Sequence, residues 1–175
     1  GLLGVRHADA IAAAGGTPVI ADLRGAAARS CAEKVAKVHG VPALGVEVDI
    51  TSIASVEALL ATVKASFGRV DILVNNAANN PKVEGTGREF SRLEDFSLDQ
   101  WNADVAVGLT GAFICAQVIG REMAEAKRGV IVNISSEYGI IAPDQRLYHK
   151  EGLPAGQQPA KPVSYTVVKA GLHGL

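Results

Sequence analysis

A tyrosine and a lysine near the end of the chain, Tyr165 and Lys169, lie four residues apart in a stretch of helical periodicity. Positions i and i+4 share one face of a helix, so the phenol and the ammonium would point into the same space. A nearby cation favours the phenolate, which suits a phenol to general acid–base chemistry. Any helix can carry this spacing by chance, so the pair needs support from other residues.

That support comes from the serines that end the preceding apolar run, Asn133-Ile134-Ser135-Ser136. Their hydroxyls can hydrogen-bond the oxygen of a substrate carbonyl. One of the two serine hydroxyls would hold that oxygen, Tyr165 would donate the proton, and Lys169 would favour the charged form of the tyrosine. The reduction of a carbonyl requires these three roles, so we take the serine pair, Tyr165 and Lys169 as candidate catalytic residues.

The first half of the chain carries candidate nucleotide-binding residues. It opens on Gly1-Leu2-Leu3-Gly4, and glycines before a helix let the backbone approach a pyrophosphate; a plain helix start explains the same residues. Asp22 ends the next predicted strand, 18 residues after Gly4. Its carboxylate can accept both hydroxyls of an adenine ribose and repel a 2′-phosphate, which favours NAD over NADP. A solvated aspartate is the alternative, and the nearby Arg24 weakens the argument for NAD.

Two further strand ends carry polar residues. Asp49 and Ile50 follow a predicted strand and could line an adenine pocket, or Asp49 could open a turn into the helix at Ser52. Asn75 and Asn76 follow the apolar run 72–74. Their amides need partners, because an unsatisfied buried polar group costs about 1–3 kcal/mol. They would bridge strands and cofactor, or form a simple turn.

Predicted strands and helices alternate along the chain. The helices are expected at 2–14, 25–38, 52–67, 98–127 and 164–175, and the strands at 18–21, 43–48, 70–74 and 130–134. Polar loops are expected at 79–97 and 140–162. This alternation indicates an α/β fold, a doubly wound parallel sheet (Rossmann fold) covered on both faces, with residues 1–175 as one domain.

The ends of the chain suggest an incomplete fold. No strand precedes the first helix and none follows the last, so we expect an interior fragment without the central first strand. Two strand edges would then need a partner.

Composition excludes several classes of function. The formal net charge is −1, with no basic patch for nucleic acid or anionic membrane. No apolar run approaches the roughly 20 residues of a membrane span. Cys31 and Cys115 have no CxxC or histidine partner, which argues against a metal site and for a reducing, cytoplasmic compartment.

In their order and spacing these motifs resemble the short-chain dehydrogenases/reductases over essentially the whole chain. The resemblance implies that Ser136 orients the substrate carbonyl, that Tyr165 is the acid/base, and that Lys169 favours the ionised phenol and binds the nicotinamide ribose. It also implies a small-molecule substrate and a homo-oligomer, dimer or tetramer. The cofactor-binding residues would be Gly1, Leu3, Gly4, Asp22, Asp49, Ile50, Asn76, Ala77, Ala78, Tyr165 and Lys169.

Two departures from the family pattern stand out. Gly108 replaces the asparagine that usually precedes Leu-x-Gly and helps to hold a proton-relay water; a backbone carbonyl with water could substitute. Tyr165 follows Ser136 by 29 residues, more than is common, because of the proline-rich loop at 140–162. That loop is most similar to relatives in flagellin modification and surface-sugar biosynthesis.

Three functions therefore compete. The first is an NAD-dependent oxidoreductase acting on an alcohol or carbonyl, sugar-derived substrates included. The second is a sugar-nucleotide epimerase or dehydratase with tightly held NAD. The third is a dinucleotide-binding protein without catalysis, for which Gly108 is the main support.

Overall fold

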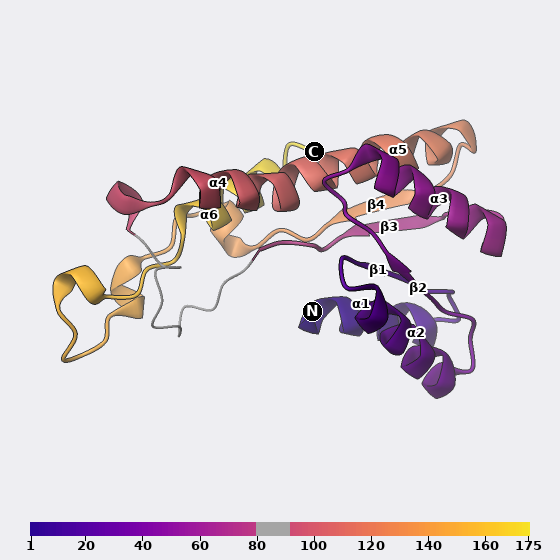
Figure 1. Ribbon diagram of the computed structural model, residues 1–175, viewed down its shortest axis with the longest axis horizontal. Coiled ribbons are helices and arrows are strands. Elements are labelled where there is room, and N and C mark those ends of the chain that lie inside the picture. The colour runs from indigo at the N-terminus through magenta and orange to yellow at the C-terminus, as the bar shows by residue number, and fades with distance from the viewer. Residues whose placement is uncertain (80–91) are drawn as a thin grey trace. The chain divides into compact units, whose positions relative to one another are not determined.

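The computed structural model describes residues 1–79 and 92–175 (Figure 1). Most of the predicted loop at 79–97, residues 80–91, lies outside the described residues. The chain divides into two compact units. Unit 1 comprises Gly1–Asn76 and Ile114–Val132, and unit 2 comprises Ala77–Phe113 and Asn133–Leu175.

Unit 1 alternates helices and strands, as the sequence predicts. Its elements are α1 (Leu2–Ala13), β1 (Val19–Asp22), α2 (Gly25–His39), β2 (Leu44–Glu47), α3 (Ile53–Phe67), β3 (Ile72–Asn75), and most of α5 (Gly111–Glu125) and β4 (Val130–Asn133). Strand β1 pairs in parallel with β2, so that Asp22 lies opposite Glu47, and β3 pairs with β4.

Helices cover both faces of the β1–β2 pair (Figure 1). On one face α1 and α2 form a small cluster around Ala12 and Val35, against which Ile20 packs. On the other face α3 and α5 form a larger cluster, against which Val19 packs. Adjacent residues of a strand point to opposite faces, so Val19 and Ile20 serve different clusters. This is the doubly wound arrangement of an α/β fold.

The ends of the unit 1 helices follow capping rules. Ser52 caps α3 by accepting a hydrogen bond from the backbone N–H of Ser55. Gly40 and Gly68 end α2 and α3 at φ 67° and φ 79°, a left-handed conformation that glycine adopts without strain. Serine before a helix and glycine after it are the residue types that local capping preferences favour at these ends.

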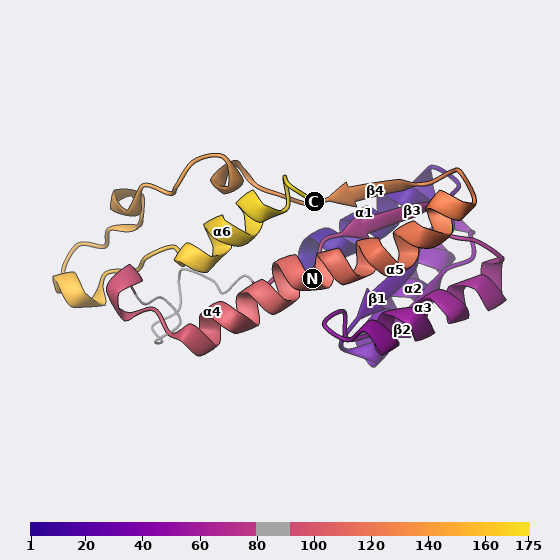
Figure 2. The same ribbon diagram turned by 90° about the horizontal axis from the view of Figure 1, so that it is seen from above.

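Unit 2 is built mainly of helices and short turns. Its elements are η1 (Leu93–Asp95), α4 (Leu98–Val105), η2 (Ala106–Thr110), the first turn of α5, η3 (Glu137–Gly139), η4 (Gln145–Tyr148), η5 (Ala155–Gln157) and α6 (Val163–Gly171). Helices α4 and α6 lie side by side (Figure 2). The loop that the sequence predicts at 140–162 contains η4 and η5 and leads directly into α6.

Some predicted elements differ in detail. The helix expected at 98–127 is interrupted by η2, a π-helical turn in which the Gly111 N–H donates to the Ala106 carbonyl. The last helix ends at Gly171, short of residue 175. The strand expected at 130–134 is present as β4 and ends at Asn133; it is largely exposed, with Val130 at 57%, because β4 pairs only with β3 in the two-stranded sheet described.

The stretch Leu98–Glu125 is long and apolar enough to cross a membrane, so the expectation that no run reaches this length is wrong. Its second half, however, contributes Ile114, Cys115, Ile119 and Met123 to the buried cluster shared with α3. These contacts are those of a core helix.

Candidate active site

Helix α6 carries the tyrosine and the lysine on which the sequence argument rests. Lys169 is buried, with 5% of its surface exposed, and its Nζ lies 5.8 Å from the centroid of the Tyr165 ring. The ammonium donates a hydrogen bond of 2.5 Å to the Ile134 carbonyl. Burial lowers the pKa of Lys169. The ammonium is therefore held between the tyrosine and the chain segment that follows β4.

That segment, residues 134–139, packs against α6. The Ser135 hydroxyl donates to the Lys169 carbonyl at 2.8 Å and lies 2.6 Å from Nε2 of His173. Ser136 caps η3, because its Oγ accepts from the Tyr138 N–H at 3.3 Å, and it donates to Glu137 Oε2 at 3.1 Å. The structure thus brings the segment of Ser136 onto the helix of Tyr165 and Lys169.

Aromatic residues enclose the catalytic tyrosine candidate. The ring of Tyr138 packs edge-on against Tyr165, with centroids 6.5 Å apart. The hydroxyls of Tyr138 and Tyr148 are 3.0 Å apart. Burial, followed by the contact with Tyr138, raises the pKa of Tyr148 to about 12. Tyr148 therefore stays protonated near neutral pH and does not supply a base.

Sequence reasoning missed Lys161, whose Nζ lies 3.8 Å from the Tyr165 ring centroid. This is closer than the Nζ of Lys169. Lys161 precedes Tyr165 by four residues, which is a helical spacing, but α6 begins only at Val163, after Pro162. Helical periodicity therefore gave no reason to place Lys161 at the tyrosine.

A buried polar pair, Asp104 and Ser164, joins α4 to α6. Ser164 is fully buried and Asp104 is 5% exposed. The Ser164 hydroxyl donates to Asp104 Oδ2, and Gln100 Nε2 donates to Oδ1 at 2.8 Å. Since Ser164 immediately precedes Tyr165, this pair fixes the start of α6. The two residues are 60 positions apart, and no sequence motif links them.

Gly108 lies where η2 crosses α6 closely. A Cβ at Gly108 would lie 2.5 Å from Cγ1 of Val168, well inside ordinary contact. A Cβ at Gly171 would likewise lie 2.8 Å from Leu109. The departure from asparagine therefore has a packing reason, because Val168 occupies the space that a side chain at position 108 needs.

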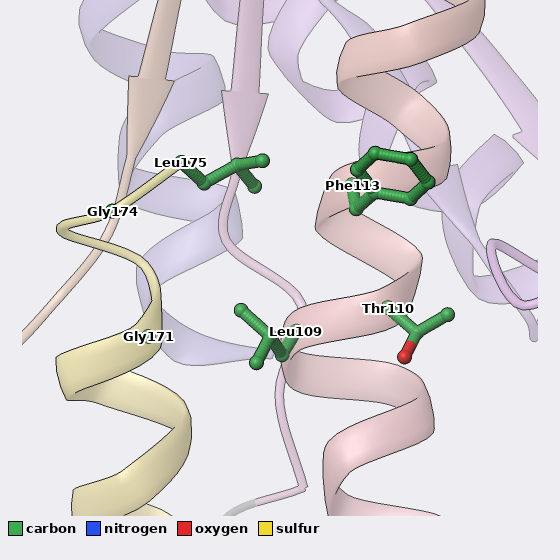
Figure 3. Close-up of a pocket in the computed structure, with 6 residues that line it drawn as sticks. All are labelled: Leu109, Thr110, Phe113, Gly171, Gly174 and Leu175. Atoms are coloured by element: carbon green, nitrogen blue, oxygen red, sulfur yellow. The ribbon is translucent and has the colours of Figure 1, made fainter.

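Beside this crossing is an open hollow of about 390 Å³. Figure 3 shows Leu109 directed toward α6 at Gly171, between the two helices. The hollow is lined by Leu109, Thr110, Phe113, Gly171, Gly174 and Leu175. This lining contains none of the candidate catalytic residues.

The candidate nucleotide-binding residues of unit 1 lie at one helix start and at strand ends. Gly1 is the N-cap of α1 without a side-chain cap hydrogen bond, and the first turn carries no acidic residue that would repel a phosphate. Leu3 in that first turn is exposed. A Cβ at Gly4 would lie 3.5 Å from Nδ2 of Asn76, so the end of β3 lies beside this helix start. Ala77, which is exposed, and Ala78, which is half-buried, follow Asn76 and belong to unit 2.

Asp22 and Asp49 are both engaged locally. Asp22 Oδ1 accepts from the backbone N–H of Arg24 at 2.9 Å and pairs with its guanidinium at 3.5 Å. Asp49 Oδ1 accepts from the N–H and hydroxyl of Thr51, and these bonds lower the pKa of Asp49. The turn that was the alternative explanation of Asp49 is therefore present, and Ile50 packs against the core cluster of unit 1.

The residues present fit a dinucleotide. The first turn of α1 carries no acidic residue, and Arg24 binds only Oδ1 of Asp22 at the end of β1. No group of three or more histidine, cysteine, aspartate or glutamate residues that could hold a metal ion occurs among residues 1–79 and 92–175.

Comparison with known proteins identifies the family. Residues 2–148 match the short chain dehydrogenase family. The chain belongs to the short-chain dehydrogenases. Among curated members, it is 34% identical to a D-threitol dehydrogenase of Mycolicibacterium smegmatis over 83% of this chain and 52% of that protein. It is also 34% identical to a 3-oxoacyl-[acyl-carrier-protein] reductase of Aquifex aeolicus over 98% of this chain and 60% of the relative.

A solved short-chain dehydrogenase has the same fold. The sorbitol-6-phosphate 2-dehydrogenase of Erwinia amylovora superposes with a TM-score of 0.79 at 28% identity. The match covers 98% of this chain and 59% of that one. The chain thus spans a little over half the length of these relatives, and its α/β architecture is the Rossmann-like fold of the family.

Proposed function

We propose that the protein is an NAD-dependent oxidoreductase that moves a hydride between nicotinamide and an alcohol or carbonyl group of a small polar substrate. One observation carries this proposal. The segment that contains Ser136 is hydrogen-bonded to α6 through Ser135 and Lys169, beside the ring of Tyr165. A hydroxyl, a phenol and a buried ammonium are thereby held in one part of unit 2.

In the direction of alcohol oxidation, Tyr165 accepts the proton of the substrate hydroxyl and Ser136 donates a hydrogen bond to the same oxygen. Lys169 favours the phenolate form that accepts this proton. In the direction of reduction, Tyr165 returns the proton to the oxygen. The nicotinamide, when bound, supplies the chemistry of hydride transfer.

Residues of unit 1 would hold the cofactor. The backbone of Gly1, Leu3 and Gly4 would bind the pyrophosphate at the start of α1, and Asn76, with the alanines that follow it, would line the nicotinamide side. Asp22 would bind the adenine ribose and select NAD, and Asp49 with Ile50 would border the adenine. The hydrogen bonds from Arg24 to Asp22 limit this selectivity, because a guanidinium at that position suits a 2′-phosphate.

The substrate that we favour is a polyol or a sugar-derived alcohol. Three relatives support this choice by name: the D-threitol dehydrogenase, the sorbitol-6-phosphate 2-dehydrogenase, and an NAD-dependent glycerol dehydrogenase of Listeria innocua. Their substrates share neighbouring hydroxyl groups. We further propose a cytoplasmic homo-oligomer, as is common in the family.

The test is an assay of NADH or NADPH formation by the whole protein with D-threitol, glycerol and sorbitol 6-phosphate. We expect turnover with NAD and a polyol. Tyr165→Phe should lower kcat at least about a hundredfold, the usual size of an acid–base contribution, while the circular dichroism spectrum stays unchanged. Near-normal turnover of Tyr165→Phe would overturn the mechanism. Preference for NADP would overturn the role of Asp22.

A further inference from the structure

The side chain of Lys161 lies against the face of the Tyr165 ring. The Nζ–centroid distance of 3.8 Å is within the range of a cation–π contact, and Lys161 is half-buried. Lys169 approaches the same ring only to 5.8 Å and directs its ammonium to the Ile134 carbonyl. Of these two ammonium groups, the one from the loop is nearer to the tyrosine ring.

The main chain of Lys161 is fixed by one side chain of the same loop. Gln145 Oε1 accepts from the Lys161 N–H at 2.8 Å, and Gln145 Nε2 donates to the Lys161 carbonyl at 3.0 Å. The amide of Gln145 therefore bonds both backbone groups of a residue 16 positions later. These two bonds set the path of the loop immediately before Pro162 and α6.

Other ionisable groups surround this contact. Burial lowers the pKa of Lys161, the positive charge of Lys169 lowers it further, and Glu137 on η3 raises it. The ring of Tyr138 packs edge-on against Tyr165, and the Tyr138 hydroxyl lies 3.0 Å from that of Tyr148. Two ammonium groups thus flank Tyr165, and Glu137 is the acidic residue that acts on Lys161.

We propose that Lys161 is a positioning residue of the acid–base centre, a second cation that favours the phenolate of Tyr165 from the face of its ring. The proposal rests on the proposed function, in which Tyr165 exchanges the proton. It gives the long interval between Ser136 and Tyr165 a role, because the loop within that interval carries both Lys161 and the glutamine that fixes it.

The physical basis is the charge of the phenolate, which spreads into the ring. A cation on the ring face attracts the ionised form more strongly than the neutral phenol, as does any opposite charge within about 4–6 Å. Loss of the cation should therefore move the ionisation of Tyr165 to higher pH. We expect a shift of about one pH unit, at the low end of the range for such pairs, because the site is only partly buried.

The experiment measures the ionisation of Tyr165 directly in the whole protein. The near-ultraviolet absorbance of tyrosinate is followed as a function of pH in the parent and in each variant. The curve of the same protein carrying Tyr165→Phe is then subtracted, which leaves the contribution of Tyr165. Lys161→Met removes the charge and keeps an unbranched side chain. Lys161→Arg retains the charge, and Lys37→Met makes the same chemical change at an exposed position of α2. Lys161→Gln replaces Lys161→Met if that variant fails to fold.

We expect the Tyr165 transition to move up by about one pH unit in Lys161→Met, and to stay within a few tenths of the parent in Lys161→Arg and Lys37→Met. The pH profile of alcohol oxidation should move by the same amount. An unchanged transition in Lys161→Met, or in Lys161→Gln where that variant replaces it, would overturn the proposal, as would an equal shift in Lys37→Met. Full activity of Tyr165→Phe would instead overturn the proposed function, so the two failures are distinguishable.

Discussion

The crossing of η2 and α6 offers a sharp test of how the helix that carries Tyr165 and Lys169 is positioned. Gly108→Ala adds a Cβ that would lie 2.5 Å from Cγ1 and 3.5 Å from Cβ of Val168. Carbon atoms prefer separations of about 3.5–4.0 Å, so α6 or η2 must move by about 1 Å. Val168 lies between Tyr165 and Lys169 on α6, and such a movement displaces both.

The magnitude follows from two opposing terms. Overpacking of a well-packed site costs about 1–3 kcal/mol. Replacement of a helical glycine by alanine raises the free energy of unfolding by up to about 1 kcal/mol, because alanine has the higher helix propensity. Gly108→Ala should therefore reduce the free energy of unfolding by about 1 kcal/mol, the middle of the range of about 0–2 kcal/mol that the two terms leave. Val168→Ala removes the close methyl group and keeps only Cβ of residue 168, which lies 3.5 Å from the added Cβ. In that background Gly108→Ala should therefore be neutral or stabilising.

Urea unfolding of the parent, the two single variants and the double variant gives the coupling energy between the positions. We expect a coupling of about 2 kcal/mol, with the effect of Gly108→Ala changing sign or vanishing when Val168 is shortened. We also expect Gly108→Ala to lower kcat more than it raises KM. Equal destabilisation by Gly108→Ala in both backgrounds would refute the packing explanation of Gly108.

Three further predictions concern single groups. Ser164→Ala removes a hydrogen bond to the buried carboxylate of Asp104 and should cost about 1.5–3 kcal/mol by urea unfolding; a loss below about 0.5 kcal/mol would contradict the bond. Hydrogen bonds from the Arg146 side chain and N–H lower the pKa of Asp144 to about 2, so Arg146→Met should raise it toward 3.8 in an NMR titration. Because the pKa of Asp144 is lower in the folded than in the unfolded protein, the stability from this pair is present above about pH 4 and is lost as the pH falls toward 2. A pKa of Asp144 that does not move in Arg146→Met would exclude the pair. Burial raises the pKa of Cys115 to about 11, so iodoacetamide should label it far more slowly in the native than in the unfolded protein, and equal rates would contradict its burial.

Local chemistry explains what the sequence could predict. The order of helices and strands follows from apolar periodicity, and the caps of α3 follow from Ser52 and Gly68, whose preferences are local. The spacing of Tyr165 and Lys169 needs only the geometry of one helix. For Asp49 the sequence left a pocket and a turn open, and the bonds to Thr51 show the turn.

Contacts between distant segments explain what the sequence could not predict. The π-helical turn at Gly108 arises where η2 meets Val168, and the bond between Asp104 and Ser164 joins residues 60 positions apart. The contact of Lys161 with Tyr165 depends on the path of a loop that Gln145 fixes. Each depends on tertiary packing, which leaves no periodic signal in the chain.

The central claim is that Ser136 and Tyr165 act on the same oxygen of the substrate. A crystal structure of the whole protein with NADH and a bound polyol or its ketone tests this directly. The account predicts that Ser136 Oγ and Tyr165 Oη both lie within about 2.6–3.2 Å of one substrate oxygen, with Lys169 beside the nicotinamide ribose. A substrate oxygen bound by other groups, with Tyr165 directed away from it, would contradict the account.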